Sequence, residues 1–146
     1  MRRLLLSLLL LATATTVFAQ SPVKQRDIKG TWKLVFDIDR SEGESSLERI
    51  ALSAVDGFLD ELDIRMTFKS DGELIVHAEA FGDSDTEYSD WTIDDDGRLH
   101  IGDSESLNID ADNVWLREGK RLVPYEMKSN GELERSDNVY LVRLRR

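Results

Sequence analysis

The sequence predicts a mainly β protein in which an antiparallel meander of eight or nine short strands closes into a barrel, with one α-helix between the first and second strands. Two observations predict this fold class. Short segments of alternating apolar and polar residues follow one another from Gly30 onward, and tight-turn signals such as Ser70-Asp71-Gly72 separate them. A long meander leaves exposed sheet edges unless it closes, and a barrel removes them. The alternative fold is an open sheet wrapped around the helix.

Residues 1–19 have the pattern of a signal peptide. Arg2 and Arg3 precede an apolar run over residues 4–11, and the small residues of Val17-Phe18-Ala19 predict cleavage before Gln20. The apolar run is too short to cross a bilayer core of ~30 Å as a helix. We therefore expect an exported protein, periplasmic or secreted, that does not span a membrane. An N-terminal anchor or a buried helix is the alternative interpretation of this segment.

The composition excludes several kinds of partner and chemistry. The chain of 146 residues is long enough for one ordinary domain, and it has 19 basic and 29 acidic residues, for a net charge of −10. That charge argues against nucleic acid or an anionic membrane surface as partner, because both are also negative. The chain has no cysteine, which removes disulfides, thiol nucleophiles and thiolate metal sites.

Two different periodicities predict the first elements of the mature chain. Residues 20–29 are polar, contain Pro22 and predict a flexible lead-in, so that the domain comprises residues 30–146. From Gly30 to Ile38 every second residue is apolar, which indicates a half-buried strand. Apolar residues then recur at steps of three and four over residues 45–62, which predicts an amphipathic helix that begins with a capping box of Ser45 and Glu48.

Strands with short connections follow the helix. The expected strands are residues 64–68, 74–81, 88–93, 99–101, 107–109, 114–117, 122–127 and 139–144. Glycines such as Gly72 and Gly97 stand in the turns, where a positive φ is needed. No helices alternate with these strands, which argues against a parallel α/β sheet.

Short motifs at both ends of the meander resemble a known family. Gly30-Thr31-Trp32 opens the first strand, and Tyr140-Leu141-Val142-Arg143 lies in the last. With the hairpin-like stretch from Trp91 to Ile101 between them, these residues resemble the lipocalin-like barrels, especially the small lipocalin-like domains of exported bacterial proteins. In that family the tryptophan plugs the closed end of the barrel and a late arginine stacks across it. The resemblance therefore implies a barrel-closing group of Gly30, Trp32 and Arg143.

The resemblance also implies a function, which is the non-catalytic binding of a small, mostly apolar ligand in the barrel cavity. An eight-stranded barrel is just wide enough to be filled by side chains or to hold one small ligand. The inward faces of the strands supply the candidate ligand-binding residues, which are Leu34, Phe36, Ile64, Met66, Phe68, Val76, Ala78 and Trp91. The same residues would also pack a filled core. The alternative function is therefore a filled-barrel module that binds another protein through its loops or acidic face. Neither function requires a cofactor.

The helix and the polar residues leave further alternatives open. The helix is either a fixed cover or a lid with Phe58 and Leu62 toward the cavity. His77 is either a surface residue or, if its face of the strand points inward, a polar ligand contact or a base paired with a carboxylate, whereas His100 is expected on the outer face with Arg98. Neither histidine has the spacing of a zinc site, and no serine lies in a nucleophile elbow.

The acidic residues between positions 83 and 96 are a candidate calcium site, because clustered carboxylates can bind this ion. Seven acids and no base lie in this stretch, but it lacks the glycine and glutamate spacing of a calcium loop. Solvated hairpin tips explain these charges without a ligand. We therefore expect no metal site in this stretch. We also expect a monomer that is not an enzyme and has no metal and no cofactor.

Overall fold

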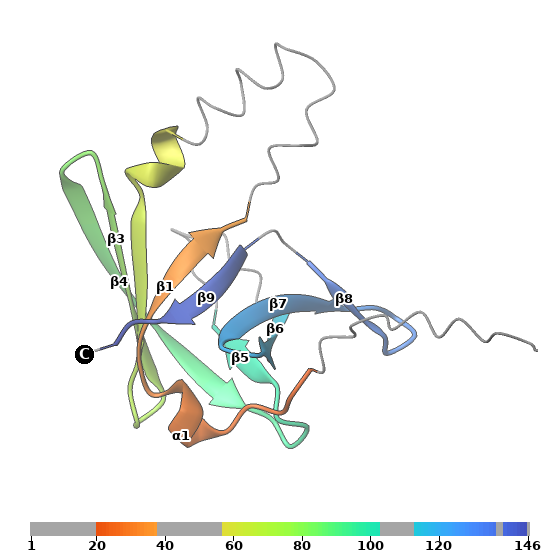
Figure 1. Ribbon diagram of the computed structural model, residues 1–146. Coiled ribbons are helices and arrows are strands. Elements are labelled where there is room, and N and C mark those ends of the chain that lie inside the picture. Colours follow the sequence, from red (N-terminus) through yellow and green to blue (C-terminus); the bar gives the residue numbers. More distant parts are fainter. Residues whose placement is uncertain (1–19, 38–56, 103–112, 137–138, 146) are drawn as a thin grey trace, which may run out of the picture.

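The described residues form nine strands, eight of which close a barrel, together with the short helix α1 and the helical residues 57–60. The computed structural model describes residues 20–37, 57–102, 113–136 and 139–145, and every structural statement below concerns these residues. In chain order the elements are α1 (Gln25–Ile28), β1 (Gly30–Phe36), β2 (Asp63–Phe68), β3 (Glu73–Ala80), β4 (Asp83–Ile93), β5 (Leu99–Ile101), β6 (Asn113–Glu118), β7 (Arg121–Met127), β8 (Leu133–Arg135) and β9 (Val139–Arg143) (Figure 1).

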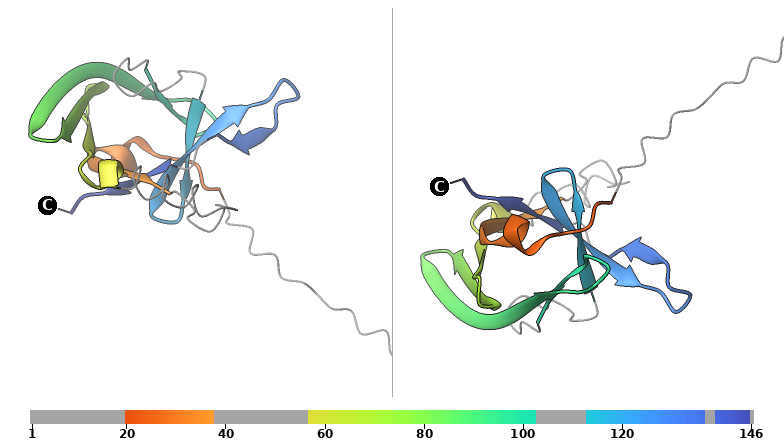
Figure 2. Two further views of the ribbon diagram at one scale, coloured as in Figure 1. Left: turned by 90° about the horizontal axis from the view of Figure 1, so that it is seen from above. Right: turned by 90° about the horizontal axis from the view of Figure 1, so that it is seen from below.

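The sheet closes on itself. Its strand order is β6-β5-β4-β3-β2-β1-β9-β7-β8, and β6 also pairs with β7, so β1 to β7 and β9 form a closed ring of eight antiparallel strands. The first strand pairs with the last, with Leu34 opposite Leu141 and Trp32 opposite Arg143. The views along the barrel show the sheet curling round to this contact (Figure 2). The predicted fold class is thus confirmed, and the open-sheet alternative is excluded.

The direction of the strands defines two ends of the barrel. One end, here called the closed end, carries α1, the turns that follow β2, β4 and β6, and the end of β9 (Figure 1). The opposite end, here called the mouth, carries the end of β1, the start of β2 and the turn between β3 and β4. The inner face between them forms one apolar cluster in which Met66, Leu74 and Leu141 are completely buried. This inner space is called the lumen below.

A second, smaller core lies outside the lumen. The first residues of β7 pair with β9, while Tyr125–Met127 pair with β8, so that the β7–β8 hairpin projects from the barrel (Figures 1 and 2). The outward side chains of β6 and β7 form a buried cluster of Val114, Leu116, Val123 and Tyr125. Leu133 of β8 and Tyr140 of β9 are partly buried and pack against this cluster. The sequence did not predict β8, because Leu133 stands alone among charged residues.

The segment 20–29 is not the flexible lead-in that its polar composition predicted. Val23 and Ile28 are buried in the main core, and the Val23 N–H donates to the Gly97 carbonyl over 2.8 Å. Ser21 forms a bridge with Arg117. The packed unit therefore begins before Gly30, because two apolar side chains of this segment cover the closed end of the barrel.

The structure also changes the interpretation of the acidic stretch. The expected turn over residues 82–85 is a two-residue turn of Phe81 and Gly82, both with positive φ, and β4 begins already at Asp83. Four of the seven acids therefore lie on β4, and only residues 94–96 lie in a turn. Residues 83–86 are all exposed, because the tip of the β3–β4 hairpin extends beyond the core.

Several expectations fall outside the described residues. These are the signal peptide, the expected strand at 107–109 and the expected helix up to residue 56, while residues 57–60 are helical. In the described ranges no helix is long and apolar enough to cross a membrane.

Candidate ligand-binding site in the barrel

All eight of the predicted ligand-binding residues belong to the lumen cluster. Six are buried, namely Leu34, Ile64, Met66, Phe68, Val76 and Trp91. The other two, Phe36 and Ala78, are only partly buried, as are Leu62 and Val139. Phe36 and Val139 are paired across β1 and β9 at the mouth. The partly buried apolar side chains of the lumen cluster thus lie mainly at the mouth, and Ile93, the last residue of β4, is the one at the closed end.

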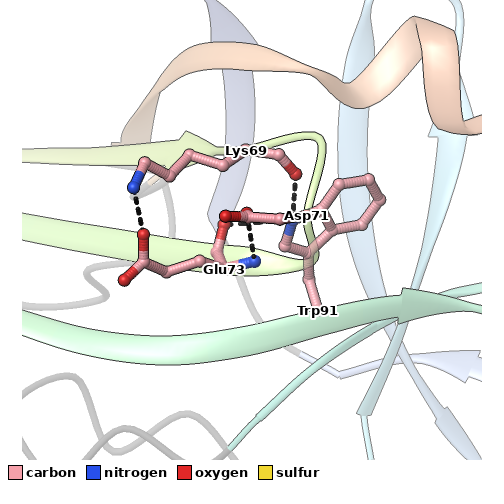
Figure 3. A network of polar contacts seen from close by, with 4 residues as sticks. All are labelled: Lys69, Asp71, Glu73 and Trp91. Carbon is pink, nitrogen blue, oxygen red and sulfur yellow. Dashed lines mark hydrogen bonds and ion pairs between the residues drawn. The ribbon is translucent and has the colours of Figure 1, made fainter.

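The three tryptophans of the chain all lie in this cluster, and their indole N–H groups have different environments. The Nε1–H of Trp32 donates to the Ile28 carbonyl over 2.7 Å. The Nε1–H of Trp91 donates to the carbonyls of Lys69 and Glu73, at 3.0 and 3.2 Å (Figure 3). Both indoles therefore use their polar atom to fix backbone at the closed end.

The turn that receives Trp91 is itself held by side chains. The Glu73 N–H donates to an Asp71 carboxylate oxygen over 3.1 Å, and Lys69 forms an ion pair with Glu73 (Figure 3). The ring of Phe68 meets Trp91 edge to face, with centroids 5.6 Å apart. Since Trp91 is tied both to this turn and to Phe68, it is a packed wall of the lumen.

Trp115 is the exception among the three. Its side chain is 2 % exposed, and its Nε1 has no hydrogen-bond partner in the part of the chain that the structure describes. Trp115 lies in the middle of β6, opposite Leu99 on one side and Pro124 on the other. A buried donor without an acceptor costs about 1–3 kcal/mol, so an acceptor is expected there. The lumen therefore contains one indole N–H that has no acceptor among the described residues.

Sequence reasoning missed Trp115 for a physical reason. Val114, Trp115 and Leu116 form a continuous apolar run, in which alternation cannot identify the inward residue. In the structure Trp115 faces the lumen, while its two neighbours face the second core. The only signal in the sequence is the presence of an indole, whose N–H needs a partner when it is buried.

The three residues predicted to close the barrel, Gly30, Trp32 and Arg143, lie together. The guanidinium of Arg143 lies over Trp32, with Cζ 5.8 Å from the ring centroid. It donates through Nη1 to the Asp27 carbonyl over 3.3 Å and through Nη2 to the Lys29 carbonyl. Gly30 has a φ of 121°, and a Cβ there would lie 3.3 Å from Nη2 of Arg143. Glycine thus leaves space for the arginine to reach the backbone before β1.

Both histidines lie on the outer face. His77 is paired with Arg65 across the sheet, and its Nδ1 lies 3.0 Å from the Thr86 hydroxyl. The inward alternative for His77 is therefore wrong, because Val76 and its alternate neighbours face the core. His100, expected outside, lies between buried Leu99 and Ile101, and its Nε2 is 2.8 Å from Asp94 Oδ2.

Asp94 organises the turn between β4 and β5. Its Oδ1 accepts the backbone N–H groups of Asp96 and Arg98, at 3.0 and 2.9 Å. Partial burial acts to raise the pKa of this carboxyl, but the hydrogen bonds from His100 and the two backbone N–H groups outweigh it and lower the pKa below its usual value. In the described ranges no group of three or more His, Cys, Asp or Glu is placed to hold a metal ion.

The described end of the helix contributes one aromatic contact. Phe58 is 51 % exposed, and its ring centroid lies 5.5 Å from that of Phe81, which is 65 % exposed at the β3–β4 turn. Leu62 instead packs against the lumen cluster. Of the two residues expected to face the cavity in a lid, only Leu62 therefore contacts the lumen, and Phe58 contacts the hairpin tip.

Comparisons of the chain with protein-family models, with curated proteins and with solved structures find no match. The functional interpretation therefore depends on the barrel and its side chains.

Proposed function

We propose that this protein is an exported, lipocalin-like carrier that binds a small, mostly apolar molecule in the lumen without chemical conversion. The observation that supports this proposal most directly is the Nε1–H of Trp115, which lies inside an apolar barrel without a partner among the described residues. A ligand with an apolar body and one hydrogen-bond acceptor matches this combination. Binding pockets of soluble proteins typically combine apolar walls with few polar groups that orient the ligand.

The ligand enters from the mouth. Toward the closed end Trp32, Trp91 and Phe68 are buried, and Phe68 packs against Trp91. At the mouth Phe36 and Ala78 keep accessible surface. Each Å² of apolar ligand surface that these side chains remove from water contributes ~25 cal/mol before the costs of ordering.

The direct test is a titration of the mature chain, residues 20–146, with fatty acids, fatty alcohols and other apolar compounds. Saturable quenching or shifting of the tryptophan fluorescence supports binding in the lumen. Ala78→Leu narrows the mouth and is expected to weaken binding, whereas His77→Leu, on the adjacent outward position of β3, serves as the matched control. Loss of binding in both variants, or in neither, contradicts the proposal.

The acceptor is tested with Trp115→Phe, which keeps an aromatic ring and removes the N–H. A lost hydrogen bond of about 1.4 kcal/mol corresponds to an affinity about tenfold lower. Ligands that have an acceptor group should lose this affinity, while a pure hydrocarbon of the same length should not. Equal losses for both kinds of ligand would show that Trp115 contributes only packing.

One observation favours the second candidate, a protein-interaction module. Phe81 has a φ of 53°, a strained conformation for a non-glycine residue, and it presents a large apolar ring to solvent. Together with Phe58 it forms an aromatic pair at the mouth. Under this alternative Phe81→Asn, which suits the turn better, abolishes capture of a partner protein and leaves the small-molecule titration unchanged.

A further inference from the structure

The closed end of the barrel carries a pocket whose charge is opposite to that of the whole chain. We propose that this pocket is a second binding site, separate from the lumen, for a small amphipathic anion that has an apolar body and one carboxylate or phosphate group. The pocket has a volume of about 430 Å³, which lies within the usual range of ~300–1,000 Å³ for small-molecule sites. Among the described residues that line it, the cationic side chains, here called its rim, are Arg117, Lys120, Arg121, Arg143 and Arg145, and the one carboxylate is that of Asp27.

The floor of this pocket is apolar. Val23, Ile28, Trp32 and Leu122, all buried members of the main core, form it together with Val142. Val23 and Ile28 come from the segment before β1, so the site exists because that segment packs across the barrel. An anion without an apolar part would leave this floor in contact with water. The combination of floor and rim therefore selects an amphipathic molecule.

Some of the five cationic side chains of the rim have partners among the described residues and others do not. Arg143 is held by backbone carbonyls, Arg121 lies over the Tyr140 ring at 4.1 Å, and Arg117 donates to the Gly119 carbonyl. Lys120 and Arg145 have no hydrogen bond or ion pair with any residue that the structure describes. These two side chains are available to approach the anionic group of a ligand.

The single carboxylate does not neutralise the rim. Asp27 lies 3.9 Å from Arg117 and 3.7 Å from Arg26, which are loose ion pairs between partly exposed groups. Such contacts contribute little, because water screens them. The cations therefore keep most of their attraction for an incoming anion.

The size of the anion follows from the charge of the whole protein. The chain has a net charge of −10, which repels an extended polyanion such as nucleic acid. At physiological ionic strength charges are screened over about 8 Å. A small anion seated among the five cations is thus exposed mainly to their field. The repulsion of polyanions and the short screening length together favour one anionic group on a compact molecule.

The two sites are independent in space. Trp32 and Leu122 are buried between the pocket and the lumen. The indole N–H resonance of Trp32 is therefore used to detect binding in the pocket, and that of Trp115 to detect binding in the lumen. A probe can therefore be assigned to one site or the other by the resonance that it shifts.

The experiment is an NMR titration of the ¹⁵N-labelled mature chain with decanoate and decyl phosphate, with decanol as the uncharged probe and acetate and inorganic phosphate as anions without a tail. We expect both amphipathic anions to shift the amides of Leu122 and Val142 and the indole N–H of Trp32. Decanol, acetate and inorganic phosphate should shift them at least about tenfold more weakly at equal concentration. Equal effects of the uncharged or the tailless probes would overturn the assigned ligand class.

The variant pair separates specific binding from general charge. Lys120→Gln with Arg145→Gln removes two exposed cations of the pocket, and Lys128→Gln with Arg135→Gln removes two from the distant β7–β8 hairpin. We expect about tenfold weaker decanoate binding for the first pair and less than about twofold change for the second. Equal affinities of the two double variants would overturn the proposal. Decanoate shifts at Trp115 alone would also overturn it, while supporting the lumen site.

Discussion

Single side chains decide what this barrel presents to its surroundings. Trp32 and Trp91 are structural, because their N–H groups hold backbone at the closed end. Trp115 is as deeply buried but has no hydrogen-bond partner among the described residues, which is why the proposed lumen site depends on it. The indole type alone does not distinguish these roles. The sequence pointed to Trp32 and Trp91 but not to Trp115. It also could not identify the acceptors of Trp91, because Lys69 and Glu73 are remote from it along the chain, whereas Ile28 precedes Trp32 by four residues.

At the residue scale, two glycines should respond in opposite directions to alanine. Gly82 has a φ of 84° in open space, so Gly82→Ala introduces backbone strain and should lower the free energy of unfolding by about 1 kcal/mol. Gly57 is helical with nothing near its added Cβ, so Gly57→Ala should raise that free energy by about 0.5–1 kcal/mol. Urea denaturation measures both. Equal shifts in one direction would contradict the assigned backbone conformations.

A second prediction at this scale concerns pH. The pKa of Asp94 is lowered in the folded state, so its charge stabilises the fold above the unfolded pKa of ~3.9 and this contribution disappears as pH falls through the folded pKa. Asp94→Asn keeps an oxygen for the backbone N–H groups and removes the charge. We expect a loss below about 1 kcal/mol at pH 6, since the group is partly exposed. The difference from the wild type should shrink below pH 4. A constant difference from pH 6 to pH 3 would contradict the role of the charge.

At the scale of elements, alternation predicted the strands well where one face is apolar and the other polar. The β1 to β5 series was recognisable for this reason, although β4 begins earlier than its apolar residues indicate. Alternation failed in two other cases. The segment 20–29 has only two apolar residues without periodicity, and β8 has one. Their burial depends on tertiary contacts, which a local pattern does not contain.

The prediction at the scale of elements concerns the segment 20–29, which covers the closed end of the barrel. A chain beginning at Lys29 lacks Val23 and Ile28 and uncovers the core beneath them. Burial of a Val or Ile side chain contributes ~1.5–3 kcal/mol. We expect the shortened chain to lose at least about 3 kcal/mol of stability relative to residues 20–146 in urea denaturation. The double variant Lys24→Ala with Arg26→Ala, which changes exposed side chains of the same segment, should lose less than about 1 kcal/mol. A stable shortened chain would mean that the segment only rests on the barrel.

At the scale of the whole molecule, the closed barrel places two different surfaces at its two ends. The described residues around the mouth include Asp37, Asp60, Glu61, Glu79 and Asp83. The basic residues near them, Lys33 and Arg65, form ion pairs with Asp63 at the start of β2. The pocket at the closed end has five cations. Composition revealed the net charge but not this separation, because the basic residues come from β6, β7, β9 and the turns and are distant in sequence. The arrangement favours an apolar ligand at one end and an amphipathic anion at the other.

The central claim is that the lumen binds a ligand, and the indole N–H resonance of Trp115 tests it most directly. A chain of residues 20–146, labelled with ¹⁵N, is titrated with a panel of apolar compounds that have a hydrogen-bond acceptor. We predict that at least one compound shifts the Trp115 indole resonance saturably, with a smaller effect on that of Trp91, whose N–H already has acceptors. A Trp115 resonance that stays unchanged across the whole panel would contradict the lumen site and leave the barrel as a filled scaffold.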